Sequence, residues 1–301
     1  MRVAPEIPDV PFTWVQAQAS GLSRAALTEL VACGRVRRVL RGVYQRADVP
    51  DTVENRLRAA ALVLSPFVVA CDRTAAWLHG VDTFEYRELE ILPPLEVVAL
   101  RGRSRTVRTG CSGGERDLSQ QDVQRLGEMW LTTPLRTALD LGCKLSRRDA
   151  LAALDGFMRV CGITREGLLR ELPRYFRRRG VIQLRQLIPL ADARAESSGE
   201  SWTRLCIVDG GLPVPELQHW VTQHGRPVFR LDLAYPRHKV AVEYDGVDFH
   251  TSDAQREADA LRRRWLREHG WTVIVVTKED FEPDRLAAWL VELRTALRVA
   301  A

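Results

Sequence analysis

The spacing of hydrophobic positions changes along the chain, and residues 11–46 contain a compact succession of short elements. Residues 13–19 have the pattern of a short helix, Gly21 provides a turn, and Ser23 suits the N-cap of a second helix. The apolar run over residues 36–44 predicts a pair of strands with a basic character. Helix, turn, helix and basic strand pair, in this order, are typical of a winged-helix DNA-binding unit.

The region from residue 47 to about residue 190 contains two further patterns. Helical and strand periods are mixed at first, with a helix expected at 53–64 and strands at 89–100. From residue 133 to about residue 190 the period is that of helices. No internal repeat or low-complexity tract occurs, so a succession of ordinary helices is expected there.

Two apolar runs near the C-terminus, 229–234 and 240–244, flank a Pro-Arg-His turn and predict a β-hairpin. Glu243 and Asp245 should share one face of the second strand, because alternate side chains point the same way. If Asp232 pairs opposite Ala241, a third carboxylate joins that face. Crowded carboxylates repel unless a cation neutralises them, and Mg²⁺ or Mn²⁺ suits such oxygen ligands. The alternative is a surface hairpin with ordinary solvated acids.

This hairpin resembles a known nuclease family in its sequence. Leu-Asp-Leu-Ala-Tyr-Pro, a short gap, Val-Ala-Val-Glu-Tyr-Asp-Gly and the downstream His250 are similar to the very-short-patch-repair-like branch of the PD-(D/E)XK nuclease superfamily. The likeness begins at Ser198-Gly-Glu200 and continues through Gly270-Trp271. It implies an α/β restriction-endonuclease-like domain with a central mixed sheet over residues 191–301.

The resemblance also implies roles for individual residues. Asp232 and Glu243 correspond to metal ligands, and Glu200 to a third acid that acts directly or through water. The superfamily signature has lysine where this chain has Asp245, and an aspartate cannot offset negative charge. His250 could handle protons in its place, or it could be a structural histidine. An inactive descendant of the family is the alternative to an active enzyme.

A second resemblance concerns the N-terminal part. The segment Gly34-x-Val-x-Arg-Val-Leu-Arg-Gly-Val-Tyr44 is similar to the winged-helix domain of AbiEi-type antitoxins of type IV toxin-antitoxin systems, and the likeness extends weakly through 72–80 and 132–141. Such antitoxins bind DNA and repress their own operon. The two resemblances together imply a winged-helix domain at 1–50, a mixed then helical antitoxin-like domain at 51–190, and the nuclease-like domain.

Basic residues gather where a nucleic acid would be expected to lie. In the N-terminal domain and on the helix after the hairpin, the candidate nucleic-acid-binding residues are Arg24, Arg35, Arg37, Arg38, Arg41, Arg256, Arg262 and Arg263. Ordinary solvated surfaces are the alternative for both groups. The run Arg-Tyr-Phe-Arg-Arg-Arg at 174–179 has aromatic rings that either stack on an unpaired base or are buried at a helix end.

Composition narrows the classes of function. The chain has 301 residues, a net charge of +5 and a pI near 9.0, which favours a polyanionic partner such as DNA. Six scattered cysteines form no zinc or disulfide pattern, and no apolar run is long enough to span a bilayer, so we expect a cytoplasmic protein. We expect a Mg²⁺- or Mn²⁺-dependent DNA endonuclease or nickase guided by the winged helix, for defence or repair.

A non-catalytic, DNA-binding antitoxin-type regulator with a degenerate nuclease-like domain is the alternative function. A toxin or a defence-system protein would be its further partner, and no membrane partner is expected. The residues leave the oligomeric state open.

Overall fold

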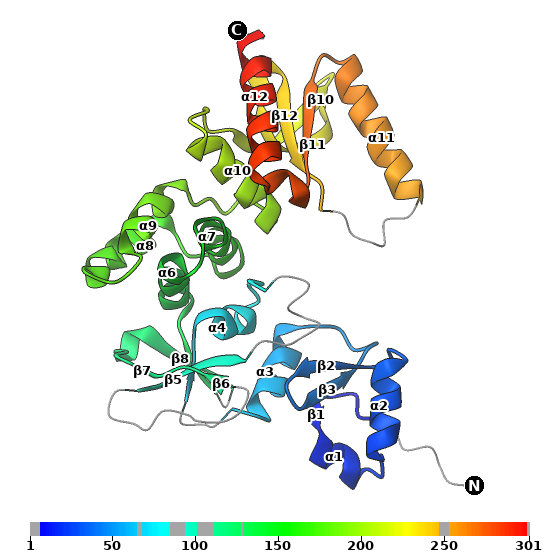
Figure 1. The fold of residues 1–301 in the computed structure, drawn as a ribbon, viewed down its shortest axis with the longest axis vertical. Helices are drawn as coiled ribbons and strands as arrows, with labels where there is room; N and C mark the ends of the chain where they lie inside the picture. Colours follow the sequence, from blue (N-terminus) through cyan, green and yellow to red (C-terminus); the bar gives the residue numbers. More distant parts are fainter. Residues whose placement is uncertain are drawn as a thin grey trace. The chain divides into compact units, whose positions relative to one another are not determined.

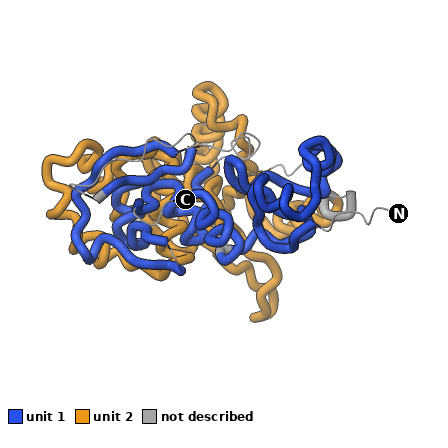
Figure 2. Tube along the Cα trace, turned by 90° about the horizontal axis from the view of Figure 1, so that it is seen from below, with its two compact units in different colours: residues 1–141 blue, residues 142–301 orange. Residues whose placement is uncertain are grey.

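The computed structural model describes residues 7–64, 68–84, 94–100, 111–127, 129–246 and 253–299. The chain forms two compact units, residues 1–141 and 142–301, each with its own arrangement of helices and strands (Figures 1 and 2). Both units mix α and β structure, and the strands of the described residues form several separate sheets. Among the described residues, no helix is long and apolar enough to cross a membrane.

Unit 1 begins with the succession of elements that the N-terminal pattern predicts. The elements are β1 (Phe12–Thr13), α1 (Trp14–Ala19), α2 (Arg24–Ala32), β2 (Val36–Leu40) and β3 (Val43–Arg46). They form a three-stranded sheet in the order β1-β3-β2. Phe12, Leu22, Leu27 and Val36 are buried together in a small core.

Side-chain caps explain where these two helices start. The Thr13 hydroxyl accepts a hydrogen bond from the Gln16 N–H, and the Gln16 side chain accepts one from the Thr13 N–H, which forms a capping box. The Ser23 hydroxyl accepts from the Ala26 N–H at 3.1 Å. Gly21 lies between the helices with φ +84°, a conformation that glycine adopts without a steric cost.

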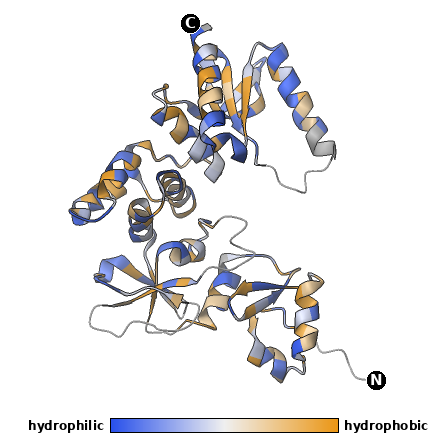
Figure 3. Cartoon of the chain, viewed as in Figure 1, coloured by the Kyte–Doolittle hydropathy of each residue, from blue (hydrophilic) through white to orange (hydrophobic). Residues whose placement is uncertain are grey.

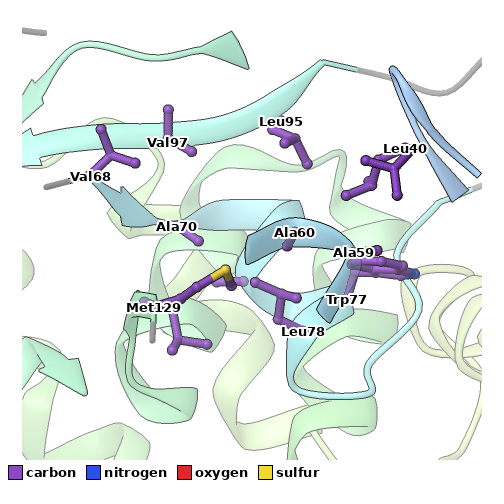
Figure 4. Packing of buried hydrophobic residues seen from close by; sticks show 13 residues of the cluster. Leu40, Ala59, Ala60, Val68, Ala70, Trp77, Leu78, Leu95, Val97 and Met129 are labelled. Atoms are coloured by element: carbon purple, nitrogen blue, oxygen red, sulfur yellow. The ribbon is translucent and has the colours of Figure 1, made fainter. Parts of the chain in front are cut away.

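The remainder of unit 1 is a mixed sheet covered by short helices. Its elements are α3 (Val53–Ala61), β4 (Val69–Ala70), α4 (Asp72–Leu78), β5 (Leu95–Leu100), β6 (Cys111–Ser112), β7 (Glu115–Arg116), β8 (Val123–Leu126) and β9 (Met129–Thr132). The strand order is β6-β5-β4-β9-β8, and β7 pairs with β5. Trp77, Leu78, Val97 and Met129 belong to the core between these elements (Figure 4). The helix expected at 53–64 ends earlier, at Ala61.

His79 ends α4, and its Nε2 donates to the Thr132 carbonyl at 2.8 Å, so its role is structural. Of the stretch 89–100, expected to form strands, the first five residues lie outside the described part of the chain.

Unit 2 opens with the predicted helices. They are α6 (Pro134–Lys144), which begins in unit 1, α7 (Arg147–Cys161), α8 (Arg165–Glu171) and α9 (Val181–Leu187). Ser146 and Thr164 cap α7 and α8 with their hydroxyls. Gly180 precedes α9 with φ +84°, and a Cβ there would lie 2.0 Å from the carbonyl oxygen of Cys143. Only glycine fits this close approach between the α9 start and α6.

The rest of unit 2 is a four-stranded mixed sheet between helices. Its elements are α10 (Ser198–Asp209), β10 (Glu216–Gln223), β11 (Arg226–Tyr235), β12 (Val240–Tyr244), α11 (Asp253–Glu268), β13 (Thr272–Val276) and α12 (Pro283–Val299). The order is β10-β11-β12-β13, antiparallel except for the parallel pair β12–β13. α10 and α12 pack on one face, and α11 packs on the other. The strands between them are markedly more hydrophobic than the outer side of α11 (Figure 3).

The hairpin β11–β12 is present, but its register differs from the expected one. Ala234, and not Asp232, lies opposite Ala241, with Leu233 opposite Val242. The turn takes up four residues, because a 3₁₀ turn at Pro236–His238 is followed by Lys239 in the left-handed conformation (φ +50°). Since the shift is two residues, it preserves which side chains share a face.

A buried ion pair fixes α10 to the preceding helices. Asp155 of α7 accepts hydrogen bonds from the Arg204 guanidinium, the Ser201 hydroxyl and the Asp192 N–H. Arg204 also donates to the carbonyl of Leu190. Both charged side chains are almost fully buried. The start of the segment between residues 190 and 198 is therefore tied to both α7 and α10.

Candidate functional site

At Asp232, the apolar side chains of strand β11 switch from one face of the sheet to the other. Leu233 and Tyr235 pack in the core beneath α10 and α12, whereas Leu231 and Phe229 pack against α11. A regular strand would place all four on one face. The change coincides with Gln218 of β10, which has a left-handed backbone (φ +55°) between the paired residues of the two strands. Asp232 can therefore be approached from the helices on both faces.

Glu200 is held at the start of α10. Its carboxylate accepts hydrogen bonds from the Ser197 hydroxyl at 2.9 Å and from the Glu196 N–H at 3.0 Å. A third donor is the Gln218 side-chain amide at 2.8 Å. The Ser197 hydroxyl in turn accepts from the Glu200 N–H, so the glutamate completes a helix cap as well as belonging to the acidic cluster.

Glu243 of β12 and Asp245, directly after this strand, lie on the same side, as the alternation predicts, and each meets an arginine of α11. Arg262 donates to both oxygens of the buried Glu243 carboxylate, at 2.6 and 2.9 Å. Arg263 donates to Asp245 at 2.7 Å. The Arg262 guanidinium also donates to the carbonyl of Arg230, which fixes its position. These arginines thus supply the positive charge next to the carboxylates of the hairpin.

Asp232 has the most perturbed carboxyl of the cluster. Burial, together with the nearby charges of Glu200 and Glu243, raises its pKa to about 7. The Arg262 guanidinium and the Tyr244 N–H act in the opposite direction. We name Glu200, Asp232 and Glu243 the acidic cluster; the proximity of its members is the feature that the nuclease resemblance implies.

The carboxylate oxygens of the two glutamates of the acidic cluster are not available to a divalent ion in this arrangement. Both oxygens of Glu243 are used by Arg262, and the carboxylate of Glu200 accepts three hydrogen bonds. Within the described residues, no group of three or more His, Cys, Asp or Glu side chains could hold a metal ion. A Mg²⁺ or Mn²⁺ ion would require Glu243 to exchange its guanidinium partner.

Two other predicted residues have no described side chain. His250 lies outside the described residues. Arg256 belongs to α11, whose backbone is described there, but the position of its side chain is not.

The arginines of unit 1 divide into two groups. Arg24 on α2, Arg35, Arg38 and Arg41 are exposed, and Arg41 lies in the turn between β2 and β3. Arg37 is half-buried and donates to the Val49 carbonyl at 2.9 Å and to the Gln45 side chain at 3.3 Å. The exposed group is free to contact a phosphate backbone, whereas Arg37 holds strand β2 against the loop that follows β3.

Of the two aromatic rings in the basic run 174–179, one is buried at a helix end and the other is exposed. Tyr175 is buried, as expected for a ring packed at a helix end. Phe176 is 67% exposed, with the Arg177 guanidinium over its ring at 5.3 Å. Arg177, directly after the two aromatic residues, has a left-handed backbone (φ +62°).

The sequence did not reveal several residues that shape the acidic cluster. Gln218 and Ser197 hold Glu200, and Arg262, expected to bind nucleic acid, instead holds Glu243. The Oε1 atom of Gln218 is buried and accepts no hydrogen bond from any described residue. Glutamines in strands and serines at helix caps are common, so their residue types do not single out Gln218 and Ser197. Their role depends on the strand register and on the left-handed backbone of Gln218.

Known proteins resemble the chain along most of its length. Residues 9–47 match the family described as "Transcriptional regulator, AbiEi antitoxin", and residues 68–190 match the "AbiEi antitoxin C-terminal domain". Two proteins of Mycobacterium tuberculosis strains, both described as uncharacterized, are 34% identical to it over 282 residues. The alignment covers 93% of this chain and 100% of each relative. The two family matches end at residue 190, before the acidic cluster.

Proposed function

Because this chain belongs to one family with the two mycobacterial proteins and carries both AbiEi antitoxin domains, we propose that it is a DNA-binding transcriptional regulator of the antitoxin type. The observation that carries the proposal is the match of residues 9–47 to the transcriptional-regulator family, over a segment that displays exposed arginines. The proposed ligand is the duplex DNA upstream of its own operon. A toxin encoded in the same operon is the proposed protein partner.

We propose that β1, α1, α2, β2 and β3 act as a winged helix on that DNA. α2 would enter the major groove with Arg24 at its N-terminal end, where its exposed guanidinium can reach base edges or phosphates. The β2–β3 hairpin would form the wing, with Arg38 and Arg41 on phosphates. Arg37 would support the wing from inside, since its Nη2 donates to the Val49 carbonyl and to the Gln45 side chain.

The test is a mobility-shift titration with the upstream DNA at several salt concentrations. Arg41→Gln should lower the affinity and reduce the slope of log K against log[salt] by about one, as expected for one lost phosphate contact. Arg298→Gln removes one exposed charge at the end of α12 and should leave the slope unchanged. Equal slopes for wild type and Arg41→Gln would contradict the proposed wing.

A second candidate function rests on the acidic cluster. We propose that residues 191–301 hydrolyse phosphodiester bonds in DNA, as the PD-(D/E)XK resemblance implies, with Mg²⁺ or Mn²⁺ bound in an arrangement in which Glu243 has released Arg262. The supporting observation is that the charges of Glu200 and Glu243 lie close enough to Asp232 to raise its pKa. The bidentate pair between Arg262 and Glu243 weighs against it, because that guanidinium already neutralises one of the two expected ligands.

Supercoiled plasmid distinguishes the two functions. A nuclease should nick it in Mg²⁺ or Mn²⁺, lose activity with chelator, and lose it in Asp232→Asn and Glu243→Gln. A regulator without this activity should leave the plasmid intact in every condition while still shifting the operator DNA. Nicking that survives both substitutions would come from a contaminating enzyme and would count against the second candidate.

A further inference from the structure

Among the described residues, none belongs to a hydrophobic core on one face of the outer part of the β10–β11 ribbon. Val221, Phe229 and Leu231 pack against α11, so their neighbours Trp220 and Arg230 point to the other face. The core beneath α10 and α12 includes Leu217 and Leu233, but not the ribbon beyond them. Trp220 is accordingly 52% exposed, which is unusual for the largest apolar side chain on a rigid strand.

Trp220 and Arg230 form a pair across the ribbon. They lie directly opposite each other in the register of β10 and β11. The Arg230 guanidinium lies 5.9 Å from the centroid of the Trp220 ring, within range of a cation–π contact. Arg230 also forms a salt bridge with Glu196 at 2.7 Å, and both side chains are partly exposed. A surface pair of this kind is weak and exchanges readily with a phosphate.

The charge of the ribbon selects the class of partner. Between Leu217 and Leu231 the chain contains His219, His224, Arg226 and Arg230 but no aspartate or glutamate. Three acids in the described part of the chain contact this segment from outside it: Glu196 through Arg230, Glu216 through His219, and Glu200 through Gln218. An exposed aromatic ring with adjacent cations and few acids suits a ligand that offers both a flat ring and negative charge. An unpaired nucleobase with its phosphate has both.

We propose that Trp220 stacks on an unpaired base of single-stranded nucleic acid while Arg230 contacts the adjoining phosphate. This contact is separate from the winged helix and from hydrolysis, and it gives residues 191–301 a binding role of their own. The ribbon is pre-formed for this role, since α11 supports its opposite face. Stacking on one ring tolerates any base, so the site should show little sequence preference.

The test compares labelled oligodeoxythymidylate of roughly 15 residues with an abasic strand of the same length, which keeps the phosphates and removes the bases. Fluorescence anisotropy should show wild type binding the thymidylate strand roughly tenfold more tightly than the abasic strand. Trp220→Leu should bind both strands with the same affinity. Trp220→Phe, which keeps a ring, should retain most of the preference.

The chain offers a matched control on another strand pair. Trp130 is 38% exposed and lies opposite Arg125, whose guanidinium is 5.7 Å from its ring centroid. Trp130→Leu removes the same kind of pair and should leave the preference for bases intact. Oligouridylate in place of thymidylate determines whether DNA or RNA is the better ligand, and a Trp220 effect on either strand supports the site.

Two results would overturn the proposal. The first is an unchanged preference for bases in Trp220→Leu that melts like wild type. The second is an unchanged affinity for every strand together with altered self-association in sedimentation, which would make Trp220 a protein contact. Operator binding through the winged helix is measured on duplex DNA, so its failure or success is independent of either result.

Discussion

At the scale of single residues, Asp232 links the geometry of the acidic cluster to the stability of unit 2. Its pKa is raised from 3.8 to about 7 in the folded chain. Between about pH 4 and pH 7 the folded state keeps a proton that the unfolded state has released. The free energy of unfolding should therefore fall as the pH rises through this window, and the contribution of Asp232 should be constant above it.

Asp232→Asn removes this dependence. Between pH 4.5 and pH 8, the unfolding free energy of wild type should fall by about 1–3 kcal/mol more than that of the variant, after allowance for the partial exposure of the carboxyl. Urea denaturation at both pH values measures the difference, and NMR of the carboxyl carbon measures the titration midpoint directly. A midpoint below pH 5 would show that the carboxylate is better solvated than its surroundings indicate.

A second residue-scale prediction concerns the buried pair of Asp155 and Arg204. Arg204→Met should destabilise unit 2 by about 3–5 kcal/mol, because it leaves a buried carboxylate without its cation. The matched control is Arg147→Met, which breaks the exposed pair with Asp209 at 2.8 Å and should cost less than about 1 kcal/mol. Denaturant titrations of both variants give the comparison, and similar losses would mean that burial is not the deciding factor.

At the scale of elements, substitutions at two glycines distinguish the cost of backbone strain from the cost of a steric collision. Gly180 and Gly211 both have a positive φ, of +84° and +72°. A Cβ at Gly180 would collide with the Cys143 carbonyl, whereas nothing lies within 4 Å of a Cβ at Gly211. Gly211→Ala should cost about 1 kcal/mol from its left-handed backbone alone, and Gly180→Ala considerably more. Thermal melting of the two variants measures the difference.

The helices were more predictable than the arrangement of the carboxylates. Ser23 caps α2 as expected, since a cap depends on local sequence. The helix expected at 13–19 is present as well, but it begins one residue later, with Thr13 as its N-cap. The register of β11 and β12 was wrong by two residues. The expected register requires a turn of two residues, whereas the turn has four and ends with Lys239 in the left-handed conformation.

The partners of the acidic cluster lay beyond prediction for a related reason. Arg262 is 19 positions from Glu243 and lies on a helix that crosses the sheet, so sequence spacing does not indicate that the two side chains meet. The change of face at Asp232 depends on the backbone of Gln218 in the neighbouring strand. Interactions of this kind are set by tertiary packing.

At the scale of the whole chain, the compact units do not end where the antitoxin matches end. The match to the AbiEi C-terminal domain stops at residue 190, but unit 2 continues from residue 142 to the last helix. The pair of Asp155 and Arg204 joins the two parts. Fragment 142–301 should therefore unfold cooperatively, whereas fragment 191–301 should be less stable, because Arg204 then lacks its carboxylate and α10 lacks α7.

Circular dichroism melting and limited proteolysis of the two fragments test this prediction. Equal melting temperatures would show that the α7–α10 contact adds nothing to the stability of the C-terminal sheet. A shift of several degrees is expected, since one kcal/mol moves the midpoint of a domain of this size by roughly 2–8 °C.

The distribution of thiols offers a practical probe of the N-terminal helix pair. Cys33 at the end of α2 is exposed, whereas the other five cysteines are buried or half-buried. Burial raises the pKa of Cys161, and that of Cys206 to about 11, so these two form thiolate only reluctantly at neutral pH. A brief exposure to a maleimide dye should label the unmodified protein at Cys33 alone, placing a fluorescent reporter beside the helix that we propose enters the groove of DNA.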